Sequence, residues 1–164
     1  MGDTVAFSQQ TYDVALAAAR AAADKIAENP VLVDVSERLV LAEAFLIVSA
    51  SSARQVNAVG EEIMDQLARN LSMKPTVIEG RSEGRWMLID YGDLVVHVFA
   101  KEDREYYALE KLWADGERRE LQAILDEENR EASPVVRLAH ASGDAPAQGQ
   151  SQGTGAVSAV DDGQ

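Results

Sequence analysis

The amino-acid sequence predicts an α/β fold of about five strands with intervening helices, followed by a polar tail. Three observations lead to this prediction. A continuous apolar run at residues 45–49 is typical of a strand that is buried on both faces. A helix with a clear start signal follows this run, and another strand follows that helix. Residues 86–100 form a pattern of two strands joined by a tight turn.

The first predicted helix spans residues 8–28. Ser8 is a suitable N-cap, and the alanine-rich tract that follows favours helix by propensity. One face of the helix would hold apolar residues at helical spacing, namely Tyr12, Leu16, Ala19, Ala22 or Ala23, and Ile26. Asn29-Pro30 is expected to end the helix, because a residue before proline avoids the helical conformation. A short strand is expected at residues 31–35.

A second helix follows the buried strand. Ser52 and Gln55 match a capping box, in which each side chain would bond the main-chain N–H of the other. Apolar residues then recur every three or four positions, at Val56, Val59, Ile63, Leu67 and Leu71. Another strand is expected at residues 75–80. Strand, helix and strand in this order indicate a βαβ crossover.

The predicted hairpin places two aspartates and a histidine close together in the sequence. Turn chemistry accounts for Asp90, Gly92 and Asp93, because aspartates bond nearby main-chain amides and glycine supplies the positive φ of a tight turn. His97 shares a strand face with Val95 and Phe99. A histidine in that setting is more often a packed residue than a catalyst.

Composition excludes several functional classes. The formal net charge of −13 opposes extensive binding to nucleic acid. It would attract a basic protein surface, but it can equally serve only to keep the protein soluble, so the charge alone does not choose a partner. The chain has no cysteine and only two histidines, His97 and His140, so we expect no metal site. No Gly-x-Ser-x-Gly elbow surrounds Ser49, Ser51 and Ser52, and the chain has no GxxxxGK(S/T) loop and no GxGxxG after a strand, so we expect no cofactor and no catalytic residue. It has no apolar run of about 18 residues and no signal-peptide pattern, which leads us to expect a cytoplasmic protein without a membrane span.

A third helix, predicted over residues 104–113, is a candidate binding surface. If Tyr106, Leu109 and Trp113 face the core, then Tyr107, Glu110 and Lys111 face away from it. An aromatic residue flanked by charges is typical of a protein-binding surface. The simpler interpretation is that this helix only packs on its sheet.

The chain is expected to divide into three regions. A folded domain would span residues 1–116, and an acidic helical extension would span residues 117–131. The remaining residues, 132–164, are expected to form a disordered tail. Glycine, serine, alanine and glutamine dominate that tail and cannot bury enough apolar surface to offset the entropy of ordering.

The chain resembles the ribosomal silencing factor family, also called the RsfS or Iojap-like family, over about residues 10 to 115. The shared residues keep their order and spacing, and they are Arg54-Gln55-Val56, Glu79-Gly80, Gly84, Trp86, Asp90, Gly92-Asp93, Val95-Val96-His97, Arg104, Tyr107, Leu109-Glu110 and Leu112-Trp113. The combination of so many fixed spacings makes the pattern specific.

The resemblance implies a mixed β-sheet flanked by helices, related to the nucleotidyltransferase fold but without its chemistry. Members of the family bind the large ribosomal subunit through the ribosomal protein numbered fourteen, at the face that meets the small subunit. Binding there prevents subunit joining and represses translation when nutrients are short. The resemblance therefore implies a protein that acts by steric occlusion and not as an enzyme.

The residues of the motif are assigned two roles. Trp86, Asp90, Asp93, Tyr107 and Glu110 are expected to form or border the contact with the ribosomal protein. Gly92, His97, Arg104, Leu109, Leu112 and Trp113 are expected to support that contact structurally. Reversing the charges of Asp93 and Glu110 together is expected to weaken ribosome binding and leave the fold intact.

Two alternatives stay open at this point. One is a metal-dependent, nucleotidyltransferase-like enzyme, which would need an Asp-x-Asp pair on a strand to hold Mg²⁺. The other is a ribosome-assembly factor that acts as a homodimer, paired through an apolar sheet edge.

Overall fold

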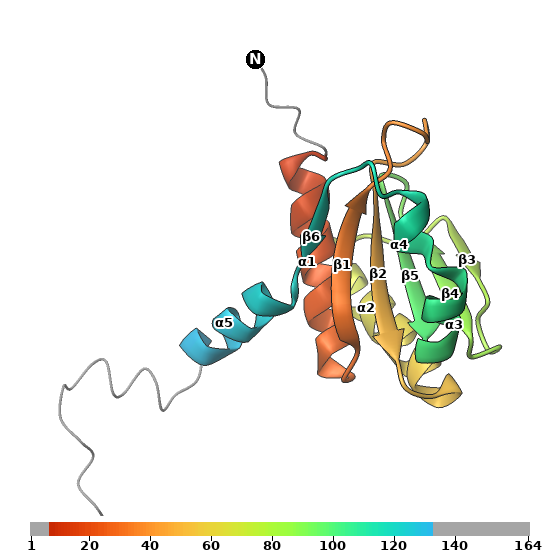
Figure 1. Ribbon diagram of the computed structural model, residues 1–164. Coiled ribbons are helices and arrows are strands. Elements are labelled where there is room, and N and C mark those ends of the chain that lie inside the picture. Colours follow the sequence, from red (N-terminus) through yellow and green to blue (C-terminus); the bar gives the residue numbers. More distant parts are fainter. Residues whose placement is uncertain (1–6, 133–164) are drawn as a thin grey trace, which may run out of the picture. The chain divides into compact units, whose positions relative to one another are not determined.

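The computed structural model describes residues 7–132, which contain a six-stranded mixed sheet with helices on both faces (Figure 1). The strand order is β3-β4-β5-β2-β1-β6. The architecture confirms the predicted α/β fold and mixed sheet. The tail predicted over residues 132–164 lies, except for Ala132, outside the described residues.

Helices and strands are interspersed along the described chain, in the order α1-β1-β2-α2-β3-β4-β5-α3-α4-β6-α5. The strands are β1 (Glu28–Asp34), β2 (Ala44–Ala50), β3 (Val77–Glu79), β4 (Trp86–Asp90), β5 (Leu94–Ala100) and β6 (Arg118–Glu120). The helices are α1 (Gln9–Asp24), α2 (Ala53–Leu71), α3 (Lys101–Tyr107), α4 (Leu109–Leu112) and α5 (Gln122–Ala132). Between residues 7 and 132, none of these helices has the length and apolar character that crossing a membrane requires.

The predicted crossover is present but joins strands that are not neighbours. β2 pairs in parallel with β5, and the other neighbouring strands pair antiparallel. The strand after α2 is β3, which runs in the same direction as β2 but lies at the edge of the sheet, beyond β4 and β5. The reason is that the long apolar strand β5 takes the central position beside β2, where both are buried along their whole length.

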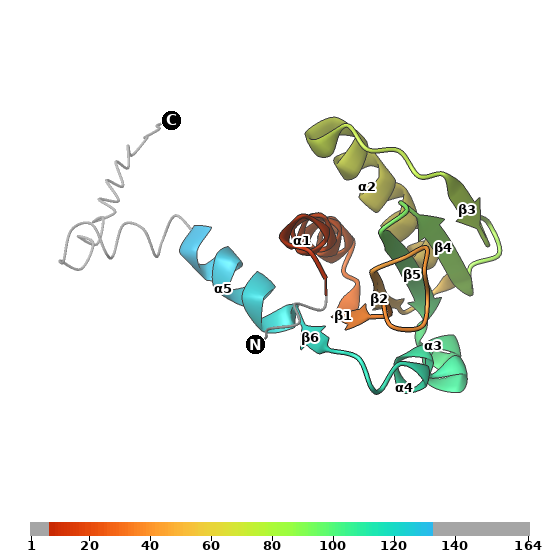
Figure 2. The same ribbon diagram turned by 90° about the horizontal axis from the view of Figure 1, so that it is seen from above.

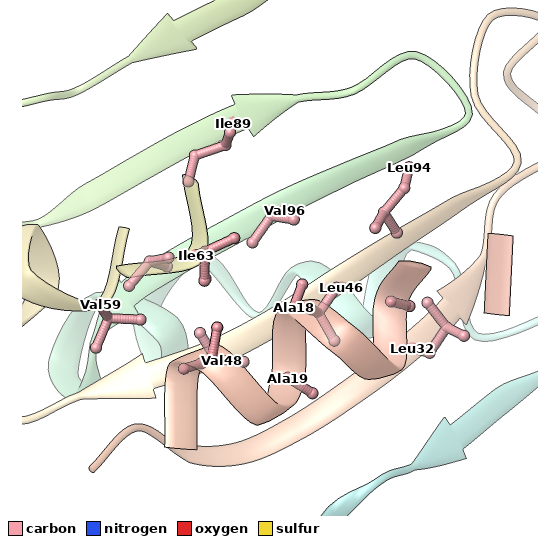
Figure 3. Close-up of a cluster of buried hydrophobic side chains, with 14 of the residues drawn as sticks. Ala18, Ala19, Leu32, Leu46, Val48, Val59, Ile63, Ile89, Leu94 and Val96 are labelled. Atoms are coloured by element: carbon pink, nitrogen blue, oxygen red, sulfur yellow. The ribbon is translucent and has the colours of Figure 1, made fainter. Parts of the chain in front are cut away.

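One face of the sheet is covered by α1 and α2 (Figure 2). Small side chains on α1, including Ala15, Ala18 and Ala22, are buried and let the helix lie close to the strands. Figure 3 shows this core, in which Val59 and Ile63 of α2 meet side chains of the central strands. The alanine-rich tract is therefore a packing surface as well as a helix-forming sequence.

The first helix is shorter than predicted. It ends at Asp24, and Ile26 has a positive φ of 65° and is exposed. β1 then begins at Glu28, so Asn29-Pro30 lies within a strand and does not end a helix. The turn is held by the side chain of Gln55, whose Nε2 donates to the carbonyl oxygens of Lys25 and Ile26 at 2.9 and 3.0 Å. This contact is distant in sequence, which is why local signals do not predict it.

Both predicted N-caps are confirmed. Ser8 Oγ accepts a hydrogen bond from the main-chain N–H of Thr11, and Ser52 Oγ accepts one from that of Gln55, each at 3.1 Å. The capping box itself is incomplete, because Gln55 Oε1 accepts from the N–H of Ser51 and not from that of Ser52. Gln55 instead links the start of α2 to the turn after α1.

The segment after residue 116 does not begin with a helix as predicted. Residues 118–120 form β6, which pairs antiparallel with β1, and α5 starts only at Gln122. All three residues of β6 are exposed, so no apolar pattern marks the strand in the sequence. Leu121 and Leu125 are buried, and the compact unit that contains them extends to Asn129.

We predict that Gly80→Ala destabilises the fold more than Gly92→Ala. Both glycines have positive φ, 76° and 94°, which costs a non-glycine residue about 1–2 kcal/mol. A Cβ at Gly80 would also collide with the main-chain carbonyl oxygen of Trp86, whereas nothing lies within 4 Å of a Cβ at Gly92. Urea unfolding should show a loss of about 3 kcal/mol for Gly80→Ala and about 1 kcal/mol for Gly92→Ala. Equal losses would contradict the packing role of Gly80.

Candidate functional site

The second face of the sheet holds a cluster of aromatic side chains. α3 and α4 lie over part of this face (Figure 2). The cluster consists of Phe45, Trp86, His97, Phe99, Tyr107 and Trp113. Trp86 stacks on Phe99 with 4.7 Å between ring centroids, and Trp86 and Tyr107 are partly exposed beside β3 and β4. The cluster therefore joins the buried core to an open surface.

His97 lies inside this cluster as a neutral residue. Its side chain is 3% exposed, and its Nδ1 accepts a hydrogen bond from Trp86 Nε1 at 3.1 Å. Burial lowers the pKa of His97 from 6.5 to about 3, so the ring carries no charge at neutral pH. The ring meets Phe45 edge-on, with 4.5 Å between centroids. This histidine orients the Trp86 indole and is too buried and too weakly basic for proton transfer near pH 7.

The helix predicted over residues 104–113 is broken into two. Ala108 has a φ of 45°, and its N–H donates to the carbonyl oxygen of Arg104, which ends α3 before α4 begins. Because of this break, the side chains do not all point to the core or to solvent as predicted. Tyr106 is 80% exposed and does not face the core, whereas Tyr107 packs on Trp86 with 4.9 Å between ring centroids. Trp113 does face the core, where its ring meets Phe45 edge-on at 5.7 Å.

Glu110 is engaged in an internal ion pair. Arg104 Nη2 and Glu110 Oε2 are 3.3 Å apart, and the two side chains are only 11% and 16% exposed. Arg104 Nη1 also donates to the carbonyl oxygen of Asn29 and to Ser49 Oγ, at 2.7 and 2.8 Å. Glu110 thus has a structural partner already. The proposed joint reversal of Asp93 and Glu110 combines an exposed residue with an internal one.

Three clefts contain most of the predicted contact residues, but they do not bring all of them together. Trp86 and Tyr107 line a cleft of about 700 Å³, which we call the aromatic cleft. Asp90 lines a neighbouring cleft of about 510 Å³, which we call the loop cleft, and Glu110 lines a third of about 730 Å³. Asp93 is exposed at the hairpin turn and lines none of the three.

The aromatic cleft has a negative rim. Its lining includes Glu79, Glu83 and Glu102, none of which forms an ion pair within the part of the chain that the structure describes. The cation in its lining, Arg85, is already paired with Asp103 at 3.1 Å. That hydrogen bond raises the pKa of Arg85 above its usual value. An apolar, aromatic surface bordered by unpaired carboxylates can bind a basic protein surface.

The remaining motif residues support this surface or lie beside it. Gly92 has the positive φ of the hairpin turn, and its N–H donates to Asp90 Oδ1 at 2.8 Å. Leu109 packs against the aromatic cluster, whereas Leu112 is 60% exposed. Residues 7–132 contain no group of three or more histidine, aspartate or glutamate side chains placed to hold a metal ion.

Sequence reasoning missed several residues of the open surface. Leu88 is partly buried next to Trp86 on β4, and the period-two pattern of the strand could have identified it. Val40 and Leu41 are 98% and 88% exposed in the loop between β1 and β2, where an apolar pair is unusual. No local signal marks Tyr106, because its exposure depends on the break at Ala108.

The description "Ribosomal silencing factor during starvation" belongs to the family model that matches residues 8–144. The chain belongs to the ribosomal silencing factor family. It is 46% identical over 98 residues to the ribosomal silencing factor of Bacillus subtilis, covering 60% of this chain and 82% of that protein. The match confirms the resemblance identified from the motif.

Two further relatives extend the comparison. A crystal structure of a Chromobacterium violaceum protein matches with a TM-score of 0.60 and 29% identity, over 63% of this chain and 86% of that chain. A mouse protein named "Mitochondrial assembly of ribosomal large subunit protein 1" is 32% identical over 85 residues, covering 50% of this chain and 37% of the mouse protein.

We predict that Glu110→Lys destabilises the protein, whereas Asp93→Lys does not. Reversing Glu110 leaves the Arg104 guanidinium without its carboxylate and adds a like charge beside it. The free energy of unfolding should fall by about 3 kcal/mol or more. Asp93 is exposed, so its reversal should change stability by less than about 0.5 kcal/mol. Similar unfolding curves for the two variants would show that the ion pair has no structural role.

We also predict a pH dependence of stability that originates in His97. The unfolded chain binds a proton at His97 near pH 6.5, but the folded protein resists protonation down to about pH 3. Stability is therefore lost as the pH falls below 6.5, by about 2 kcal/mol between pH 7 and pH 5. Urea unfolding at both pH values should show this loss in the wild type and a smaller one in His97→Gln. An identical pH dependence in the variant would rule out this origin.

Proposed function

We propose that this protein represses translation by binding the large ribosomal subunit at the face that meets the small subunit. Occupation of that face blocks subunit joining without any chemical step, so the protein acts as a regulator and not as an enzyme. The partner is the ribosomal protein numbered fourteen, which the family resemblance implies. The protein acts in the cytoplasm when nutrients are limiting.

The observation that supports this proposal most strongly is the open surface around Trp86 and Tyr107. Tyr106 and Tyr107 are 80% and 48% exposed and lie edge-to-face with 5.0 Å between centroids. Exposed aromatic residues of this kind provide much of the binding energy in protein interfaces. The unpaired carboxylates of Glu79, Glu83 and Glu102 around them complement a basic protein.

Charge and family membership support the same partner class. The net charge of −13 disfavours direct contact with ribosomal RNA and favours a basic protein on the ribosomal surface. The family description refers to silencing of ribosomes during starvation, and the name of the mouse relative refers to the large subunit. The name of the mouse relative also supports a second candidate role, in assembly of the large subunit. In that role the protein could act as a homodimer.

The deciding experiment is co-sedimentation with separated ribosomal subunits, followed by a subunit-joining assay. Binding to the large subunit alone, with joining inhibited, is the expected result. Failure to bind the large subunit would refute the proposal. The assembly role would be favoured by two results. Subunit joining would be normal in the assay, and large-subunit precursors would accumulate in cells that lack the protein.

We predict that Tyr106→Ala weakens binding to the large subunit about tenfold, because the exposed ring is removed from the centre of the contact. Its stability should be nearly unchanged, since Tyr106 is 80% exposed. Ile26→Ala is a matched control, because Ile26 is 72% exposed and lies in the turn before β1. Co-sedimentation titrations of the two variants should differ, and equal affinities would exclude this surface as the contact.

A further inference from the structure

The loop cleft adjoins the aromatic cleft. It is bordered by the loop between β1 and β2 on one side and by β3, β4 and β5 on the other. Its lining is mainly apolar and includes Leu41, Phe45, Leu88 and Val95. Glu79 and Leu88 line both clefts, so the two form a continuous surface.

The charged side chains of the loop cleft that lack an ion-pair partner within residues 7–132 are carboxylates. Glu79 and Asp90 line it, and neither forms an ion pair among residues 7–132. Its cation, Arg38, is already engaged. Arg38 donates to Asp115 at 2.7 Å and to the carbonyl oxygen of Leu112 at 3.1 Å, and its guanidinium lies 5.8 Å from the Trp113 ring centroid. The cleft is therefore an apolar groove with two available carboxylates along one side.

The loop that borders this cleft presents unpacked aliphatic side chains. Val40 is 98% exposed and Leu41 is 88% exposed, although both line the cleft. Neighbouring side chains of the same loop, Leu39 and Ala42, pack on the aromatic cluster and anchor it. An anchored loop with exposed aliphatic residues next to an apolar groove is suited to contact a partner.

We propose that the loop cleft receives a long basic side chain, lysine or arginine, from the same protein partner. The aliphatic part of that side chain would lie on Leu88 and Val95, and its cationic end would meet Glu79 and Asp90. Val40 and Leu41 would pack along the partner beside it. Charge complementarity selects this occupant, because an acidic or neutral side chain would leave both carboxylates without a counter-charge. The inference rests on the function proposed above and adds a second anchor to it.

The test is the double variant Glu79→Gln/Asp90→Asn in the full chain, measured by co-sedimentation with large subunits. Asparagine at position 90 keeps the oxygen that accepts from the Gly92 N–H, so the turn should be retained. We expect binding about tenfold weaker than wild type, with a difference that shrinks as salt is raised. Asp65→Asn/Glu127→Gln removes the same charge from two exposed sites on α2 and α5 and should bind like the wild type.

A second variant tests the apolar part of the proposal. Val40→Ser/Leu41→Ser should also weaken binding about tenfold, because both side chains are exposed in the free protein and need not support its fold. The proposal is overturned if both loop-cleft variants bind like the control while Tyr106→Ala is weakened. In that case the proposed function stands. If the wild type does not bind large subunits, the proposed function and this inference fail together.

Discussion

The second face of the sheet depends on the Arg104 guanidinium. Arg104 lies on α3 and joins three other elements, through Glu110 on α4, the carbonyl oxygen of Asn29 on β1 and Ser49 on β2. Asn29 adopts a φ of 52° at a register shift in β1, which presents that carbonyl. A largely buried guanidinium is tolerated only when its donors are satisfied, so this network fixes both short helices on the strands. The open surface next to them follows from that placement.

The aromatic cluster connects the buried core with the open surface through ring packing. His97 is buried, uncharged at neutral pH and bonded to the Trp86 indole, so its imidazole acts as a rigid aromatic side chain with one polar contact. Trp86 packs against both Phe99 and Tyr107, with 4.7 and 4.9 Å between ring centroids. A surface built from side chains that already hold one conformation loses little entropy when a partner binds. The residue most suggestive of catalysis in the sequence thus holds the indole of Trp86, which lies in the proposed binding surface.

The two faces of the sheet differ in how far helices cover them. The face under α1 and α2 is closed by alanine, valine and leucine side chains and contributes most of the apolar burial. The other face is covered only in part, and its open region combines aromatic residues, exposed aliphatic residues and unpaired carboxylates. The proposed steric occlusion would need a rigid surface of this kind and no reactive group. The negative charge of the whole chain then favours encounter with a basic partner.

Local patterns in the sequence determined the elements whose stability is largely local. The apolar run of β2, the Ser52 cap of α2 and the Asp90–Gly92 turn were all predictable, because periodicity, capping and turn chemistry act over a few residues. The family motif likewise identified the fold. Only the tertiary structure decided the end of α1, the break at Ala108 and the strand β6. The end of α1 depends on the distant contact of Gln55 with the turn after α1, and β6 depends on its pairing with β1 and on the hydrogen bond from Leu121 N–H to the carbonyl oxygen of Pro30. The break at Ala108 lies at a positive φ that no glycine or proline announces in the sequence. The ion pair with Arg104 made Glu110 an internal residue, and the break at Ala108 left Tyr106 exposed.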